Sequence, residues 1–133
     1  MRTVGIDPDG FVGLSLGELG CSYMDRCFSA EQVMLAAYYY GHAVLETELI
    51  RGSVSVVRLG AQEARELCPP DIEVACHNGP KFCTLSGPAE SMKKFLKILQ
   101  KEGVFAEVVN CGSIAHHSKH ISSVEPLLLK YLK

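Results

Sequence analysis

Two different periods of apolar and polar positions divide the middle of the chain into strands and helices. Alternating apolar residues predict strands over residues 54–59, 72–76, 82–86 and 104–109. Helical spacing marks residues 61–68 and 88–102, and the second helix should bury a face formed by Met92, Phe95, Leu96 and Leu99. The resulting order over residues 53–109, β-α-β-β-α-β, is typical of the ferredoxin-like, split βαβ fold.

Helical patterns also flank this unit. Ser29 and Gln32 have the spacing of a capping box, which predicts a helix from there to about Glu48. The face of this helix that we expect to be buried consists of Val33, Met34, Ala37, Tyr38, Gly41, Val44 and Leu45. A Leu-rich helix is expected over residues 124–132.

Upstream of the capping box, a turn signal at residues 8–10 precedes Phe11 and Val12, which are typical of the end of a buried strand. Residues 16–23 can form a short helix. The elements on both sides of the ferredoxin-like unit would have to meet in space. We therefore predict an α/β fold in three segments: 1–51, the inserted unit 52–110, and 111–133, where the chain returns to the larger subdomain.

Composition limits the kind of protein this can be. Of its 133 residues, 47% are hydrophobic and 21% are charged, which is a globular composition with enough apolar residues for a sizeable core. A net charge of -2 argues against a nucleic-acid partner or an anionic membrane, since both need a broad positive surface. No apolar run approaches a membrane span and residues 1–8 lack a secretory signal, so we expect a cytoplasmic protein.

Cysteine and histidine spacing gives no support for a disulfide framework or a metal centre. None of the six cysteines forms a Cys-x-x-Cys pair, and we expect reduced thiols. His116 and His120 would share one face if the segment were helical, but no spacing supplies the further ligands that zinc needs. We expect no metal site.

Residues 13–17, Gly-Leu-Ser-Leu-Gly, have the spacing of a nucleophile elbow, a strained turn that holds a serine oxygen clear of a sheet. The expected strand before them and helix after them are the context that this motif requires. Ser15 would lie at the N-terminus of that helix, where free N–H groups and the helix dipole stabilise an oxyanion. The same spacing also fits a Gly-rich connection with no chemical role.

A serine nucleophile needs a base, and the five histidines are the candidates. His42 lies on a predicted helix and His77 near a strand end, where solvated or hydrogen-bonded structural histidines are usual. The cluster at residues 116–120 follows the last strand of the inserted unit and is the best candidate. No Asp or Glu is evidently placed to orient it, so a serine-histidine dyad held by a backbone carbonyl is favoured over a triad.

Several separated segments can be compared with known families. They are Gly-Leu-Ser-Leu-Gly-Glu-Leu-Gly (13–20), Ala-Ala-Tyr (36–38), Cys-Pro-Pro (68–70), Ala-Cys-His-Asn (75–78), Leu-Ser-Gly-Pro (85–88), Glu-Gly-Val-Phe-Ala (102–106) and His-Ser (117–118). Together, and in this order, they resemble the malonyl/acetyl transferase domain of an animal, insect-like type I fatty acid synthase. The resemblance implies a partial α/β-hydrolase-like acyltransferase subdomain with an inserted ferredoxin-like subdomain.

The resemblance also implies an activity in fatty acid biosynthesis: transfer of an acetyl or malonyl group from coenzyme A to the phosphopantetheine thiol of an acyl carrier protein. Ser15 would be the acylated nucleophile, His117 the base and then the acid, and the Leu16 N–H an oxyanion donor. Coenzyme A thioesters would be substrates, with no permanently bound cofactor. The partners would be the acyl carrier protein and neighbouring fatty acid synthase domains.

Three residues of the expected acyl pocket depart from the family pattern. Leu14 replaces the histidine that usually precedes the nucleophile, and His116 replaces an aromatic residue before the catalytic histidine. Tyr40 stands where the family has the arginine that pairs with the malonyl carboxylate, so we expect weakened selectivity for malonyl.

Two other functions compete with an acyltransferase. A noncatalytic remnant or interaction fragment of a fatty acid synthase would explain the three departures, and a generic serine esterase would share the elbow but would need an acidic triad member. The presence of both Ser15 and His117 favours the enzyme. Because the resemblance covers only the middle of the family's domain, we expect exposed apolar faces and poor solubility or partner dependence.

Overall fold

The computed structural model describes residues 4–133, and the chain divides into two compact units. The first unit comprises Met1–Glu46 and Pro126–Lys133, of which residues 1–3 lie outside the described part, and the second comprises Thr47–Glu125. The predicted segments 1–51, 52–110 and 111–133 assign the chain to two subdomains of a larger domain. This assignment to subdomains stays a prediction.

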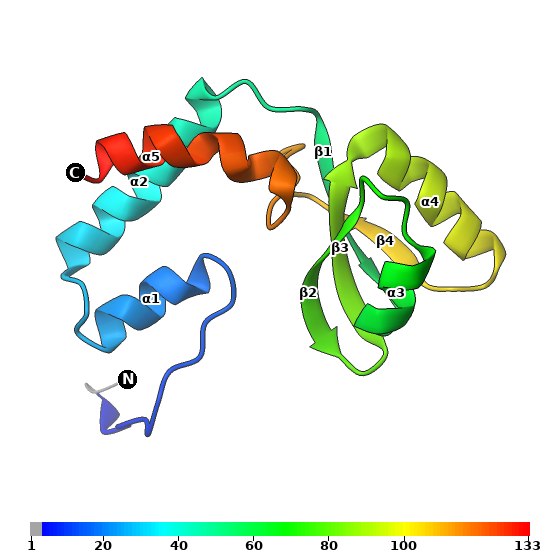
Figure 1. The fold of residues 1–133 in the computed structure, drawn as a ribbon. Helices are drawn as coiled ribbons and strands as arrows, with labels where there is room; N and C mark the ends of the chain where they lie inside the picture. The colour runs from blue at the N-terminus through cyan, green and yellow to red at the C-terminus, as the bar shows by residue number, and fades with distance from the viewer. Residues whose placement is uncertain (1–3) are drawn as a thin grey trace. The chain divides into compact units, whose positions relative to one another are not determined.

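The second unit contains a four-stranded antiparallel sheet and two α-helices (Figure 1). Its elements are β1 (Gly52–Val57), α3 (Ala61–Leu67), β2 (Glu73–Gly79), β3 (Phe82–Pro88), α4 (Ala89–Lys101) and β4 (Ala106–Val109). The strands lie in the order β2-β3-β1-β4, and each neighbouring pair is antiparallel. The predicted order β-α-β-β-α-β is confirmed, although Pro88 ends β3 and precedes α4 instead of being the first helical residue.

The hydrophobic core of this unit lies between one face of the sheet and both helices. Val57 and Cys83 face each other across β1 and β3, and Leu85 shares their side of the sheet because it lies two residues further along β3. The four predicted residues of α4 are all buried there: Met92, Phe95, Leu96 and Leu99. Burial of each such side chain stabilises the fold by about 1.5–3 kcal/mol. The helix stops before Gly103, whose φ of 76° suits glycine.

The first unit is helical. It consists of α1 (Gly17–Met24), α2 (Ala30–Glu46) and most of α5 (Glu125–Tyr131), which follows the 3-10 helix η2 (Lys119–Val124) of the second unit. The capping box is confirmed, since the Gln32 N–H donates to the Ser29 hydroxyl at 3.2 Å and the Ser29 N–H donates to the Gln32 side chain at 2.8 Å. These two contacts satisfy N–H groups that the first turn of α2 leaves without helical partners.

Two expectations for the first unit are wrong. Phe11 and Val12 do not form a strand, and all strands of the described residues belong to the second unit. The expected buried face of α2 is wrong in part: Val44 is buried as predicted and Ala43 is buried beside it, whereas Met34 and Leu45 are 69% and 86% exposed. Residues 33–45 are apolar almost all the way round the helix, so periodicity could not select the face that packs.

Exposed apolar side chains are concentrated in the first unit. The large ones on its elements and loops are Val4, Ile6, Val12, Leu14, Leu16, Tyr23, Phe28, Met34, Leu35, Tyr38, Leu45, Leu129 and Leu132. All six cysteines are free thiols. No helix in residues 4–133 has the length and apolar character of a membrane span.

Candidate functional site

Ser15 lies in a tight turn directly before α1. Its φ is 57°, in the left-handed region that non-glycine residues seldom occupy. The turn is closed by the Gly17 N–H, which donates to the Leu14 carbonyl at 2.9 Å, while the Glu18 N–H donates to the Ser15 carbonyl at 3.0 Å. A strained serine at the entrance to a helix is the geometry that the Gly-x-Ser-x-Gly spacing predicts.

The two glycines of this motif have different steric surroundings. A β-carbon on Gly13 would lie 2.4 Å from the Gly17 carbonyl oxygen and 2.8 Å from the Cys21 sulfur, so only glycine fits there. A β-carbon on Gly17 would meet nothing within 4 Å. Gly13 therefore lets the turn fold closely against the start of α1, whereas Gly17 is not needed for space in the described part of the chain.

The predicted oxyanion donor, Leu16, follows Ser15 in the same turn. Its N–H donates no hydrogen bond to any group in residues 4–133, and its carbonyl accepts from the Leu19 N–H at 3.2 Å. The N–H is thus one of the free donors that a helix N-terminus carries. The side chains of Leu14 and Leu16 are both mostly exposed.

Tyr40 lies on α2, in the same unit as Ser15. Its ring is half-buried, and the loss of solvent around the phenol raises its pKa. The hydroxyl therefore stays neutral at physiological pH and can act as a hydrogen-bond donor.

His116 and His117 belong to the second unit and lie in residues 110–118, the connection between β4 and η2, which we call the histidine turn. His117 has a φ of 58°, and the turn contains two further left-handed residues, Gly112 and Ser113. Burial lowers the pKa of His116, the charge of His117 lowers it further, and a hydrogen bond with the backbone of Cys111 opposes both effects. Burial therefore favours the neutral form of the His116 ring.

On its N-terminal side, this histidine turn is fixed by a close backbone contact with β1. The Gly52 N–H donates to the Ser113 carbonyl at 2.7 Å. A β-carbon on Gly52 would lie 2.2 Å from the backbone nitrogen of Ala115, whose own side chain is buried. The absence of a side chain at Gly52 thus lets the residues just before His116 cross the start of the sheet.

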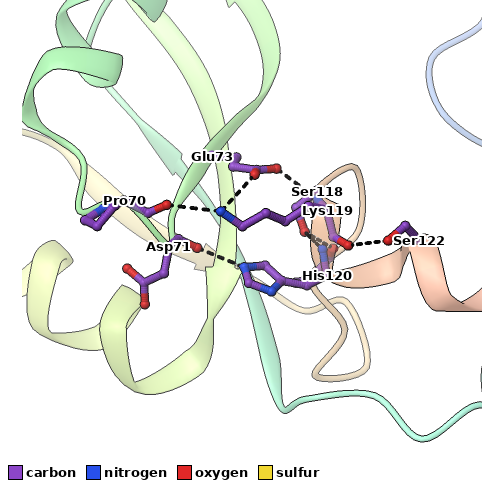
Figure 2. A network of polar contacts seen from close by, with 8 residues as sticks. Pro70, Asp71, Glu73, Ser118, Lys119, His120 and Ser122 are labelled. Atoms are coloured by element: carbon purple, nitrogen blue, oxygen red, sulfur yellow. Dashed lines mark hydrogen bonds and ion pairs between the residues drawn. The ribbon is translucent and has the colours of Figure 1, made fainter.

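On its C-terminal side, the turn is fixed by a polar network that Figure 2 shows. The Glu73 carboxylate accepts the Lys119 N–H at 2.9 Å and lies 3.4 Å from the Lys119 Nζ, which also donates to the Pro70 carbonyl at 3.2 Å. His120 Nε2 lies 3.0 Å from the Asp71 carbonyl oxygen. The segment after His117 is therefore tied to β2 and to the loop before it.

Ser118 forms hydrogen bonds to the residues on either side of the two histidines. Its hydroxyl donates to the Ala115 carbonyl at 2.7 Å and accepts the His120 N–H at 3.3 Å, so it spans His116 and His117. These supporting contacts were not predicted from the sequence. The partners of Lys119 and His120 lie 46 to 49 residues away along the chain, and no local spacing indicates such pairs.

The other two histidines have structural or solvent environments. His42 Nδ1 lies 2.9 Å from a Glu46 carboxylate oxygen, and the Tyr131 hydroxyl donates to the other oxygen of the same carboxylate. His77 is exposed on β2. In residues 4–133, no three His, Cys, Asp or Glu side chains are grouped as metal ligands. His120 lies in η2, whereas His116 precedes this helix, so the two histidines do not share a helical face.

The predicted site residues therefore fall into two groups. Leu14, Ser15 and Leu16 share one turn of the first unit, which also carries Tyr40, and His116 and His117 share one turn of the second unit. In each turn the residue predicted to act chemically, Ser15 in the first and His117 in the second, has a left-handed backbone conformation.

Comparison with known proteins bears on the family. The model of the family described as "Acyl transferase domain" matches residues 1–133. A reducing polyketide synthase of Fusarium langsethiae is 37% identical over 124 residues, which are 91% of this chain and 5% of that protein. The low-reducing polyketide synthase of Aspergillus calidoustus is 32% identical over 135 residues, 97% of this chain and 6% of its own length. The chain thus spans about one-twentieth of these relatives.

Solved structures share the fold. The acyltransferase domain of the polyketide synthase PpsC of Mycobacterium tuberculosis matches with a TM-score of 0.90 at 19% identity, over 98% of this chain and 40% of that one. The malonyl CoA-acyl carrier protein transacylase of Burkholderia pseudomallei matches with a TM-score of 0.86 at 21% identity, over 98% of this chain and 46% of its own. Both of these sequence relatives are fungal polyketide synthases, so the predicted animal fatty acid synthase type is not confirmed.

Proposed function

Because the chain belongs to the acyl transferase domain family and is closely related to the acyltransferase domains of polyketide synthases, we propose that it carries the acylated serine of such a transferase. The reaction is transfer of an acyl group from coenzyme A to the phosphopantetheine thiol of an acyl carrier protein. The observation that carries the proposal is the left-handed turn at Ser15, backed by Gly13 and followed directly by α1. A role in fatty acid biosynthesis in particular is a more specific form of the same proposal.

In the first half-reaction, the Ser15 hydroxyl attacks the carbonyl carbon of an acyl-coenzyme A thioester while His117 accepts its proton. The oxyanion that forms on the carbonyl oxygen is stabilised by the free Leu16 N–H at the start of α1. The carbon–sulfur bond then breaks, and the departing thiolate takes the proton from His117. The products are acyl-Ser15 and free coenzyme A.

In the second half-reaction, the phosphopantetheine thiol gives its proton to His117 and its sulfur attacks acyl-Ser15. Collapse of the second oxyanion breaks the bond to Ser15, whose oxygen recovers the proton. Both steps need the Ser15 oxygen and a ring nitrogen of His117 within about 2.6–3.2 Å during the reaction. Thioester exchange is close to neutral in free energy, so the enzyme's task is to activate the hydroxyl, stabilise the oxyanion and keep water away.

Leu14, Tyr40 and His116 would shape the acyl pocket. A neutral tyrosine hydroxyl offers a single hydrogen bond, whereas an arginine offers a charged, two-pronged partner for a carboxylate. We therefore propose that uncharged acyl groups are preferred to malonyl. The partners would be an acyl carrier protein and the neighbouring domains of a polyketide or fatty acid synthase, and coenzyme A thioesters would be the donors, with no resident cofactor.

The test is intact-mass spectrometry of the purified chain after incubation with acetyl-CoA and, separately, with malonyl-CoA. One acyl adduct that is absent from Ser15→Ala establishes the first half-reaction. The His117→Ala variant should lose the adduct while His116→Ala keeps it, and the reverse result would reassign the base. No adduct from either donor would favour the second candidate, a noncatalytic fragment, which the changes at Leu14, Tyr40 and His116 support.

A further inference from the structure

The histidine turn is held by contacts that differ in strength. One of them, made by His120, lies close in sequence to His117. The Lys119 side chain and Glu73 are both partly exposed, so solvent screens their ion pair and it contributes little to stability. His120 is half-buried, and its ring nitrogen meets a backbone carbonyl at 3.0 Å. His120 is also only three residues after His117 and is joined to it through Ser118.

The acceptor of this contact is itself fixed. The Asp71 side chain accepts a hydrogen bond from the Ser91 hydroxyl of α4 at 2.9 Å. Its carbonyl oxygen lies so close to β3 that a β-carbon on Gly87 would be 2.8 Å away. Asp71 is therefore tied to α4 through its side chain, and its carbonyl lies close against β3, so a side chain that binds this carbonyl is linked to the packed part of the unit.

We propose that His120 is a positioning residue for His117: its Nε2–H donates to the Asp71 carbonyl and so holds the histidine turn in place. A carbonyl can only accept, so Nε2 must carry the hydrogen in this contact. Both the imidazolium and one neutral tautomer have that N–H, and the contact persists whichever charge His120 carries. The role in catalysis rests on the proposed function of His117.

The chain offers closely matched variants. In His120→Gln, the amide nitrogen reaches the place of Nε2 and can still donate to Asp71. In His120→Phe, the ring volume is kept and the donor is lost, and in His120→Asn the donor is too short to reach. His77→Phe is the control, because it makes the same replacement at an exposed histidine of the same unit.

The first readout is NMR of the His117 ring, which does not depend on activity. We expect the His117 ring resonances to shift in His120→Phe and to stay at the wild-type position in His120→Gln and His77→Phe. If His120→Phe fails to fold, as shown by loss of dispersion in the spectrum, His120→Asn takes its place with the same expectation. Unchanged His117 resonances in the folded variant would overturn the proposal.

The second readout is the rate of Ser15 acylation by acetyl-CoA across a range of pH. A displaced base should lower the maximal rate at least about tenfold, because misplacement by 1 Å can cost about a hundredfold, while the concentration of acetyl-CoA at half-maximal rate stays within about twofold. His120→Gln should restore most of the rate. Equal losses in His120→Gln and His120→Phe would also overturn the proposal. If the wild type forms no adduct, the proposed function fails, and the NMR measurement alone decides whether His120 positions the turn.

Discussion

Replacement of Gly52 by alanine should separate the histidine turn from the sheet. The new β-carbon would lie 2.2 Å from the Ala115 nitrogen, 2.7 Å from the Ala115 β-carbon and 2.7 Å from the Ile114 carbonyl carbon. Two of these atoms belong to the backbone, so no flexible side chain can move aside. Ordinary van der Waals contact begins near 3.4 Å, and the turn must therefore retreat by more than about 1 Å.

The magnitude follows from two losses. Overpacking of this kind costs about 1–3 kcal/mol. The retreat also breaks or lengthens the hydrogen bond from the Gly52 N–H to the Ser113 carbonyl, whose net contribution is about 0.5–1.5 kcal/mol. The free energy of unfolding should fall by about 2–4 kcal/mol in total. If the proposed role of His117 is right, a shift of this size should also slow acylation by roughly a hundredfold.

Urea denaturation of wild type, Gly52→Ala and Gly79→Ala measures the first quantity. Gly79 ends β2 in the same unit, a β-carbon there would meet nothing within 4 Å, and its φ is not positive, so Gly79→Ala should stay within about 0.5 kcal/mol of wild type. Rates of acyl-Ser15 formation by intact-mass spectrometry measure the second. A Gly52→Ala protein as stable as the Gly79→Ala control would refute the reasoning about the close contact.

Three further predictions concern the core, the histidine pair and the acyl pocket. Leu99→Ala should lower the free energy of unfolding by about 2–5 kcal/mol in urea denaturation, and Ile98→Ala, on the exposed side of α4, by far less. Burial and the neighbouring His117 lower the pKa of His116, so the unfolded chain binds more protons than the folded chain just below pH 6.5. The free energy of unfolding should therefore fall as the pH drops through that window. A His116→Asn variant should show a flatter pH dependence of stability in thermal melts. Tyr40→Arg should raise the ratio of malonyl to acetyl adduct at Ser15, and an unchanged ratio would remove Tyr40 from the pocket.

The second unit was largely predictable from the sequence because its local signals are strong and agree. Helix α4 has apolar residues at i, i+3, i+4 and i+7 and lysines on the other side, so one face alone could be buried. The strands alternate and are separated by Gly and Pro, which fixes their order along the chain. The capping box of α2 was predictable for the same reason, since both partners lie within four residues.

Other features depend on residues far apart in sequence or on packing partners. The periodicity of α2 could not identify its buried side because apolar residues surround the helix, and burial there depends on which elements pack against it. The strand expected at Phe11 and Val12 needed a hydrogen-bonded neighbour that the described residues of its unit do not supply. The contacts of Lys119 and His120 with the loop before β2 are long-range, so only the folded sheet brings them together.

Backbone strain alone does not identify a functional residue in this chain. Four non-glycine residues in the described part have a positive φ, Ser15, Arg26, Ser113 and His117, and each costs of order 1–3 kcal/mol relative to relaxed backbone. Glycine would relieve that strain at all four positions, but at Ser15 it would remove the hydroxyl and at His117 the imidazole. Ser113 contributes its backbone carbonyl to the contact with Gly52, a role that glycine could also fill. The inference to function therefore needs both a strained backbone and a side chain whose chemistry glycine cannot supply. Ser15 and His117 have both features, and each also lies in a motif that the sequence alone indicates, the Gly-x-Ser-x-Gly spacing and the histidine cluster.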